Sequence, residues 1–203
     1  MKPNTPPLPA KPRMPTGMSI EQARLIGVVL AGGRSSRMGR DKALLPWEGR
    51  PLIEHQIEVL LAAGAQAVKV SGNRPDYHGV TDPVPQAGPL GGVAGIAAAC
   101  ENAELLIVPV DMPRLQPALL ARLCPIDTAG CVRFAGHVLP MRLRLDAACR
   151  DALKSLLTAG DERARSIRAL QERVGVHEIA LSTEEAAQLI DCNTEETWRE
   201  VNA

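Results

Sequence analysis

Short apolar runs alternate with stretches of helical spacing through the first 125 residues. Residues 26–30 (IGVVL) form an unbroken, β-branched-rich run typical of a strand buried on both faces, and residues 67–70 and 104–110 predict two more strands. Residues 51–64 have helical spacing, with Pro51 near the predicted start and Gly64 as the C-cap, and the small-residue segment 88–103 predicts a closely packed helix. This alternation indicates right-handed crossovers and a mostly parallel sheet.

The second half of the chain has a less regular pattern. Residues 135–145 (AGHVLPMRLRL) suggest strands with an alternating arginine face, and we expect helices near residues 147–159 and 162–173. A strand near residues 174–180 and a helix after Asn193 complete the predicted elements. The expected fold class is α/β: one three-layer α/β/α, Rossmann-like domain over residues 24–203, whose C-terminal half supplies a lid or a second binding surface.

The charge balance argues against a general nucleic-acid binder. The chain of 203 residues carries 23 Lys and Arg against 23 Asp and Glu. Residues 131–174 nevertheless hold nine basic against five acidic residues, whereas residues 175–203 hold one against seven. The basic stretch suits a discrete anionic ligand, and on charge alone it suits a solvated helix face equally well.

Cysteine usage and the chain start bear on location. The five cysteines are scattered without metal-binding spacing, which favours reduced thiols and a cytoplasmic location. No apolar run approaches the roughly 20 residues of a membrane span. Residues 1–23 are proline-rich and lack an apolar h-region, so they predict a disordered tail rather than a targeting peptide.

A glycine-rich segment with several basic residues follows the first predicted strand. In "LAGGRSSRMGRDKALL" (residues 30–45), the small residues let the backbone approach a ligand, and ligands of open parallel sheets bind at such strand ends. The spacing matches neither GxxxxGK[ST] nor GxGxxG, so we expect a third kind of phosphate loop. Taken alone, the two glycines would favour a tight turn with solvated charges.

The same segment resembles the signature LAGGxSxRMGxDKxLL of the nucleotidyltransferases related to molybdenum cofactor guanylyltransferase. The match continues in order through "GRPLIEH", "GPLGG", "VDMP" and "NTEE", and it spans about residues 26–200. The resemblance implies a nucleotidyltransferase fold in which residues 24–125 bind the nucleotide and residues 126–203 bind the acceptor. It also implies an Mg²⁺-dependent enzyme that transfers GMP from GTP to the phosphate of molybdenum-loaded molybdopterin and releases pyrophosphate.

The resemblance further implies roles for single residues on the nucleotide side. Arg37 and Lys42 would hold the triphosphate and the leaving pyrophosphate, and Asp111, at the end of an apolar strand, would hold Mg²⁺. Asp111 could also cap a helix starting near Pro113, and both roles are compatible. Family members often carry Asn at the position of Ser71, so Asn73 is a candidate to take over a contact. The implied nucleotide-binding set is Leu30, Ala31, Gly32, Gly33, Lys42, Ser71, Asn73, Asp82, Gly88, Leu90 and Asp111.

On the acceptor side, the resemblance is weaker. The implied acceptor-binding residues are Arg163, Arg165, Asp191 and Asn193, supported by the basic stretch 131–174. Asp191 stands where the family usually has Asn, and Leu139 stands where many relatives have His before a proline. Asn193 also reads as the N-cap of the last helix, with Glu196 completing a capping box.

Two alternatives to the guanylyltransferase hypothesis stay open. The first is a sister nucleotidyltransferase that uses CTP or another phosphorylated acceptor, although the LAGG and GPLGG loops resemble the guanine-using branch. The second is a non-catalytic GTP-binding protein that delivers the cofactor. A molybdenum-insertion protein or a molybdoenzyme chaperone is an expected partner; no nucleic acid or membrane is expected.

Overall fold

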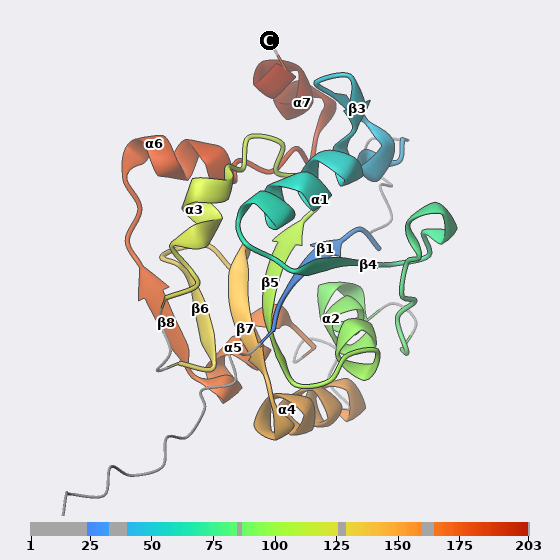
Figure 1. Ribbon diagram of the computed structural model, residues 1–203, viewed down its shortest axis with the longest axis vertical. Helices are drawn as coiled ribbons and strands as arrows, with labels where there is room; N and C mark the ends of the chain where they lie inside the picture. Colours follow the sequence, from blue (N-terminus) through green and yellow to red (C-terminus); the bar gives the residue numbers. More distant parts are fainter. Residues whose placement is uncertain (1–23, 33–39, 85–86, 126–128, 160–164, 203) are drawn as a thin grey trace, which may run out of the picture.

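A six-stranded sheet forms the centre of the computed structural model, which describes residues 24–32, 40–84, 87–125, 129–159 and 165–202 (Figure 1). The predicted tail, residues 1–23, lies outside the described residues. The strand order is β4-β1-β5-β7-β6-β8. β1 pairs in parallel with β4 and β5, and β6 with β8, whereas β7 runs antiparallel to β5 and β6. The strands are β1 (Leu25–Leu30), β4 (Ala67–Ser71), β5 (Ala103–Pro109), β6 (Cys131–Phe134), β7 (Met141–Leu145) and β8 (Val176–Ile179).

Helices cover both faces of the sheet, as Figure 1 shows. α1 (Leu52–Ala62) and α3 (Pro117–Ala121), with the short α6 (Thr183–Ala186) and the 3₁₀ turn η4 (Ala187–Leu189), lie on one face. α2 (Gly88–Ala98), α4 (Ala147–Thr158) and α5 (Ile167–Val174) lie on the other. Within β1, Val28 belongs to the core beneath α2 and Val29 to the core beneath α1, and both are fully buried. The predicted three-layer α/β/α fold is therefore confirmed.

A smaller apolar cluster joins the C-terminal helix to the first half of the chain. Trp47 of β2 (Pro46–Trp47) packs edge-on against Trp198 of α7 (Glu195–Asn202), with ring centroids 6.0 Å apart. β2 forms a two-stranded ribbon with β3 (Arg50–Pro51), directly after the 3₁₀ turn η1 (Lys42–Leu44). The cluster therefore brings the segment before α7 beside η1, although about 150 residues separate them in sequence.

Several predicted boundaries differ from the structure. α3 begins at Pro117 rather than near Pro113, and the strand β6 over residues 131–134 was not predicted at all. β6 was missed because its four residues, including Arg133, show no alternation that can be read from the sequence, yet all four are buried. α5 begins at Ile167 because Ser166 caps it, its Oγ accepting a hydrogen bond from Ala169 N at 3.1 Å. No helix among the described residues is long and apolar enough to cross a membrane.

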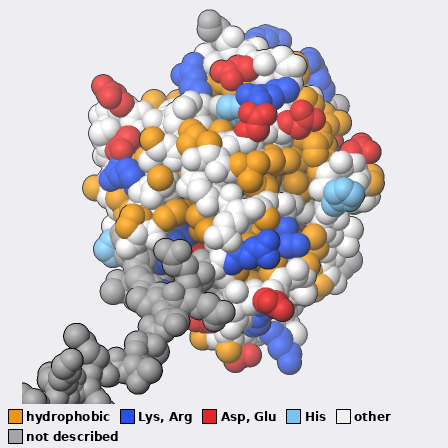
Figure 2. Space-filling view, in the orientation of Figure 1, with side chains coloured by type: hydrophobic (Ala, Val, Ile, Leu, Met, Phe, Trp, Pro, Cys, Tyr) orange, Lys and Arg blue, Asp and Glu red, His pale blue; other side chains and the backbone are white. Residues whose placement is uncertain are grey.

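Several arginines of the basic stretch 131–174 make hydrogen bonds or ion pairs with other described residues of the chain. Arg142 and Arg144 on β7 both donate to Glu104 of β5, at 2.9 and 3.1 Å, and the Arg142 side chain is only 3% exposed. Arg133 pairs with Glu178 of β8, and Arg150 donates to backbone carbonyls at the end of α2. On the face shown in Figure 2, basic and acidic side chains are interspersed. These arginines therefore tie strands and helices together, and the expectation that they hold an anionic acceptor is corrected for these positions.

Candidate active site

The carboxyl ends of β1, β4 and β5 lie at one edge of the sheet, because Leu30 pairs with both Ser71 and Pro109. A cavity of about 270 Å³ opens at this edge. Such an edge is where open α/β sheets bind ligands. The predicted site residues that line the cavity are Leu30, Ala31, Gly32, Lys42, Ser71, Asp82, Gly88, Asp111 and Asn193. Leu139 lines it as well.

Two glycines let the backbones of neighbouring loops meet beneath the cavity. A Cβ atom at Gly72 would lie 2.7 Å from Gly32 Cα and 2.9 Å from Gly32 N, and Gly72 has a φ of +114°. Ala31 N donates to Ser71 O at 3.0 Å, which continues the β1–β4 pairing to the start of the glycine-rich segment. Only glycine fits at position 72 without displacing that segment.

Lys42 is the centre of the polar contacts in the cavity. Its Nζ lies 3.1 Å from Asp111 Oδ2 and 2.5 Å from Asn193 Oδ1, and the Lys42 and Asp111 side chains are only 15% and 18% exposed. Lys42 lies in η1, and Asp111 lies in the turn that follows β5. The site therefore presents a lysine and a carboxylate from different elements, close to where a triphosphate would meet strand ends.

The structure separates two roles that the sequence left open. Asp111 is not the cap of α3, because this helix begins at Pro117 with Gln116 as its N-cap. Asn193 does not form the predicted capping box; Thr194 Oγ1 accepts from Thr197 N at 3.1 Å at the start of α7. The Asn193 side chain is instead turned to Lys42. The side chains of Asp111 and Asn193 therefore both contact Lys42 in the cavity.

Asp82 lines the cavity, and one oxygen of its carboxylate lacks a hydrogen-bond partner among the described residues. Its Oδ1 is buried and has no hydrogen-bond partner within the described part of the chain. Burial raises the pKa of Asp82 above its ordinary value. A buried acceptor without a donor is costly, because it has given up its hydrogen bonds to water.

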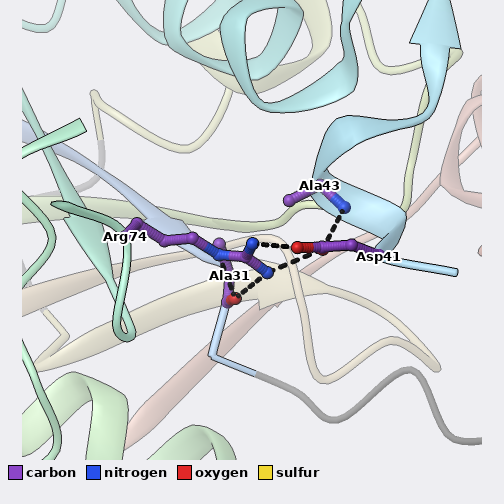
Figure 3. Close-up of polar contacts among 4 residues, drawn as sticks. All are labelled: Ala31, Asp41, Ala43 and Arg74. Carbon is purple, nitrogen blue, oxygen red and sulfur yellow. Dashed lines mark hydrogen bonds and ion pairs between the residues drawn. The ribbon is translucent and has the colours of Figure 1, made fainter. Parts of the chain in front are cut away.

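Sequence reasoning missed a second charged pair at the same edge, formed by Arg74 and Asp41 (Figure 3). Arg74 Nη2 donates to Asp41 Oδ1 at 2.7 Å, and Arg74 Nε and Nη2 both donate to Ala31 O, at 3.2 and 3.0 Å. The pair lowers the pKa of Asp41, chiefly through the hydrogen bond from Arg74. Asp41 lay inside the recognised signature, but no local pattern marks Arg74, 33 residues further along the chain.

A second cavity, of about 550 Å³, shares Pro109, Asp111 and Leu139 with the first. Asp191 and His137 line it, and Asp191 is exposed. Asp111 thus stands between a cavity at the glycine-rich loop and one bordered by the C-terminal half. This arrangement suits two ligands that meet at Asp111.

The remaining predicted residues lie elsewhere. Leu90 is fully buried in the core beneath α2, and Asn73 is exposed outside the cavity lining. Arg165 donates to Ala159 O at 3.0 Å and lines neither of the two cavities. Gly33, Arg37 and Arg163 lie outside the described residues.

The first cavity suits a magnesium ion that takes most of its ligands from substrate phosphates and water. No group of three or more His, Cys, Asp or Glu side chains that could hold a metal occurs among the described residues. The first cavity does contain the partly exposed carboxylate of Asp111. Mg²⁺ in nucleotide-binding sites is commonly held by one or two carboxylates, with substrate phosphates and water completing its octahedron.

The fold and the cavity define an α/β protein whose candidate ligand site lies at the carboxyl ends of parallel strands. The family described as the MobA-like NTP transferase domain matches residues 27–176, and the chain belongs to this family. The chain is 53% identical over 173 residues to a protein named molybdenum cofactor guanylyltransferase from Xanthomonas euvesicatoria pv. vesicatoria (strain 85-10), covering 85% of this chain and 91% of that relative.

A solved structure has the same fold. It is described as molybdopterin-guanine dinucleotide biosynthesis protein A from Archaeoglobus fulgidus, and it aligns with a TM-score of 0.69 over 87% of this chain and 96% of that one, at 18% identity. A further relative, named nicotine blue oxidoreductase, from Paenarthrobacter nicotinovorans, is 32% identical over 199 residues, 87% of this chain and 91% of its own length. Because relatives of about that identity carry different names, the residues of the site are needed to argue the activity.

Proposed function

We propose that this protein transfers GMP from GTP to the terminal phosphate of molybdenum-loaded molybdopterin, forming the guanine dinucleotide and releasing pyrophosphate. The observation that carries the proposal is the cavity at the ends of β1, β4 and β5, in which Lys42, Asp82 and Asp111 meet the glycine-rich segment. The 53% identity to a relative named for this activity supports the same substrates.

GTP would occupy the first cavity. The backbone of Leu30, Ala31 and Gly32 approaches the nucleotide, and Gly88, the first residue of α2, also lines the cavity. Asp82 lines the cavity and offers its carboxylate to hydroxyl or amino donors of the nucleoside. Gly33 and Arg37 lie outside the described residues, and we assign them to the triphosphate because they belong to the signature.

The transfer itself needs alignment and charge neutralisation rather than a covalent nucleophile. An oxygen of the acceptor phosphate attacks the α-phosphorus of GTP; the bond from that phosphorus to the β-bridging oxygen breaks, and pyrophosphate leaves. Lys42 stabilises negative charge on the phosphates, and Asn193 and Asp111 hold its ammonium in place. Mg²⁺, held by Asp111 and the phosphates, would supply further neutralisation of the triphosphate.

The acceptor would occupy the second cavity, which meets the first at Asp111. Asp191 is a surprising neighbour for a phosphorylated ligand, but the 2-amino-4-oxopyrimidine edge of a pterin presents paired N–H donors. A carboxylate accepts such a pair well. We therefore assign Asp191 to the pterin ring and Asn193 to the boundary with Lys42, and we retain Arg163 and Arg165 as acceptor candidates. Because GTP is the donor, we place the reaction in the cytoplasm, with a molybdenum-insertion protein or a molybdoenzyme chaperone as partner.

The test is pyrophosphate release from GTP, CTP, ATP and UTP with Mg²⁺, each with and without molybdenum-loaded molybdopterin. Release from GTP only when the pterin is present is the expected result. Release from CTP instead would assign the protein to a cytidylyl-transferring branch. GTP binding without release from any nucleotide would refute the enzymatic proposal and favour a delivery role. Repeating the assay without Mg²⁺ tests the metal requirement.

A further inference from the structure

Arg74 connects the two ends of the glycine-rich segment. Its guanidinium donates to the carbonyl of Ala31 on the N-terminal side and to the carboxylate of Asp41 on the C-terminal side (Figure 3). Residues 33–39 lie between these anchors in the sequence. Arg74 is only 17% exposed and lines the first cavity without belonging to the signature.

The loop that carries Arg74 is itself firmly held. Gly79 N donates to Arg74 O at 2.8 Å, and Tyr77, in the 3₁₀ turn η2 (Pro75–Tyr77), donates through its hydroxyl to Glu54 of α1 at 2.9 Å. A planar guanidinium on such a platform fixes two partners at once, which a lysine cannot do with the same geometry. The anchoring is therefore a built feature rather than a chance surface pair.

Asp41 has two consequences for the site next to it. It caps η1 by accepting from Ala43 N at 3.1 Å, and Lys42 lies in this turn. It also lines the first cavity, where an uncompensated carboxylate would repel a triphosphate. Both the position of Lys42 and the charge beside the phosphates therefore depend on what Asp41 contacts.

We propose that Arg74 is a positioning residue for nucleotide binding: it holds Ala31 and Asp41 in place and cancels the negative charge of Asp41 beside the triphosphate. The inference rests on the proposed binding of a nucleoside triphosphate in the first cavity. It does not depend on the identity of the acceptor. Arg74 acts through its neighbours, so its removal should weaken nucleotide binding more than it slows the transfer step.

The experiment compares Arg74→Ala, Arg74→Lys, Asp41→Asn and the double variant Arg74→Ala/Asp41→Asn. Asparagine is as good an N-cap as aspartate, so Asp41→Asn removes the charge and keeps the acceptor for Ala43 N. The matched control is Arg122→Ala. Arg122 also bridges a carboxylate, Glu185, and a backbone carbonyl, Ala180 O at 3.0 Å, but it lines neither of the two cavities.

The measurements are the Kd of GTP by calorimetry, KM and kcat where transfer occurs, and the midpoint of thermal unfolding. We expect Arg74→Ala to raise the Kd and KM of GTP at least about 10-fold with a smaller change in kcat, and Arg74→Lys to fall between it and the wild type. The double variant should bind GTP at least about 3-fold more tightly than Arg74→Ala, because the exposed charge is gone. Arg122→Ala should lower the midpoint of thermal unfolding by about as much as Arg74→Ala does, and it should leave the Kd of GTP unchanged.

A Kd for Arg74→Ala within 2-fold of the wild type would overturn the proposal, as would an equal rise in Arg122→Ala. A double variant no better than Arg74→Ala would overturn the charge-cancelling role. If the wild type binds a different nucleotide, the same series is measured with that nucleotide. A failure of GTP transfer is thereby distinguished from a failure of this inference.

Discussion

The close approach of Gly72 to Gly32 gives a prediction that joins stability to nucleotide binding. Replacing Gly72 with alanine places a Cβ 2.7 Å from Gly32 Cα, whereas ordinary van der Waals contact begins near 3.4 Å. The two backbones must therefore separate by at least 0.3 Å, and by 0.7 Å to reach ordinary contact. The atoms that resist are main-chain atoms of the segment proposed to hold the nucleotide, so no side chain can simply rotate away.

The chain contains a matched control for this change. Gly64, after α1, has a φ of +103° but no atom within 4 Å of an added Cβ, whereas Gly72 has a φ of +114°. Both alanine variants carry the strain of positive φ, about 1–2 kcal/mol, and the same gain from a stiffer unfolded chain. Only Gly72→Ala adds overpacking, which costs about 1–3 kcal/mol. The difference between the two variants isolates the crowding against Gly32.

Urea unfolding should therefore show Gly72→Ala less stable than Gly64→Ala by about 1–3 kcal/mol, with the same m-value. A misplacement of about 1 Å at a binding site can lower activity about 100-fold, so the smaller shift in Gly72→Ala should raise the Kd of GTP by about 10-fold, and Gly64→Ala should leave it unchanged. Equal losses of stability and unchanged GTP affinity in both variants would refute the idea that Gly72 sets the position of the glycine-rich segment.

Three further predictions follow from single side chains. Asp111→Asn keeps the side-chain shape but removes the charge, so it should lower turnover by at least about 100-fold with little change in unfolding midpoint; near-normal turnover would remove Asp111 from the mechanism. Asp82 has a raised pKa, so the folded state loses stability as pH rises from about 3.9 through that raised value. Asp82→Asn should therefore be more stable than the wild type to urea at pH 7 and weaker in GTP binding, and lower stability would contradict the burial argument. Burial raises the pKa of Cys131 to about 12 and of Cys192 to about 11, so iodoacetamide at pH 8 should modify the half-buried Cys100 and Cys124 before these two. Peptide mapping that found Cys192 modified in the folded protein would contradict this order.

The first half of the fold could be predicted because its signals are local. Buried parallel strands such as β1 and β5 are continuous apolar runs, and the helices between them keep a helical spacing. In the second half, the alternation over residues 135–145 predicts strands, but no local signal gives their place in the sheet. β7 is a central strand that carries two arginines, and Glu104 on β5 accepts hydrogen bonds from both of them. The two arginines lie 38 and 40 positions from Glu104 in the sequence, and neither segment alone indicates that they pair.

Asn193 shows the same limit within the site itself. Its local sequence, with Glu196 three residues later, is that of a helix cap, and that interpretation was reasonable without knowledge of its neighbours. The structure turns its side chain to Lys42, 151 residues away, because the Trp47–Trp198 contact fixes α7 beside η1. Thr194 then takes over the cap. The apolar cluster around Trp47 and Trp198 therefore determines whether Asn193 reaches Lys42, so this contact of the lysine depends on hydrophobic packing outside the cavity.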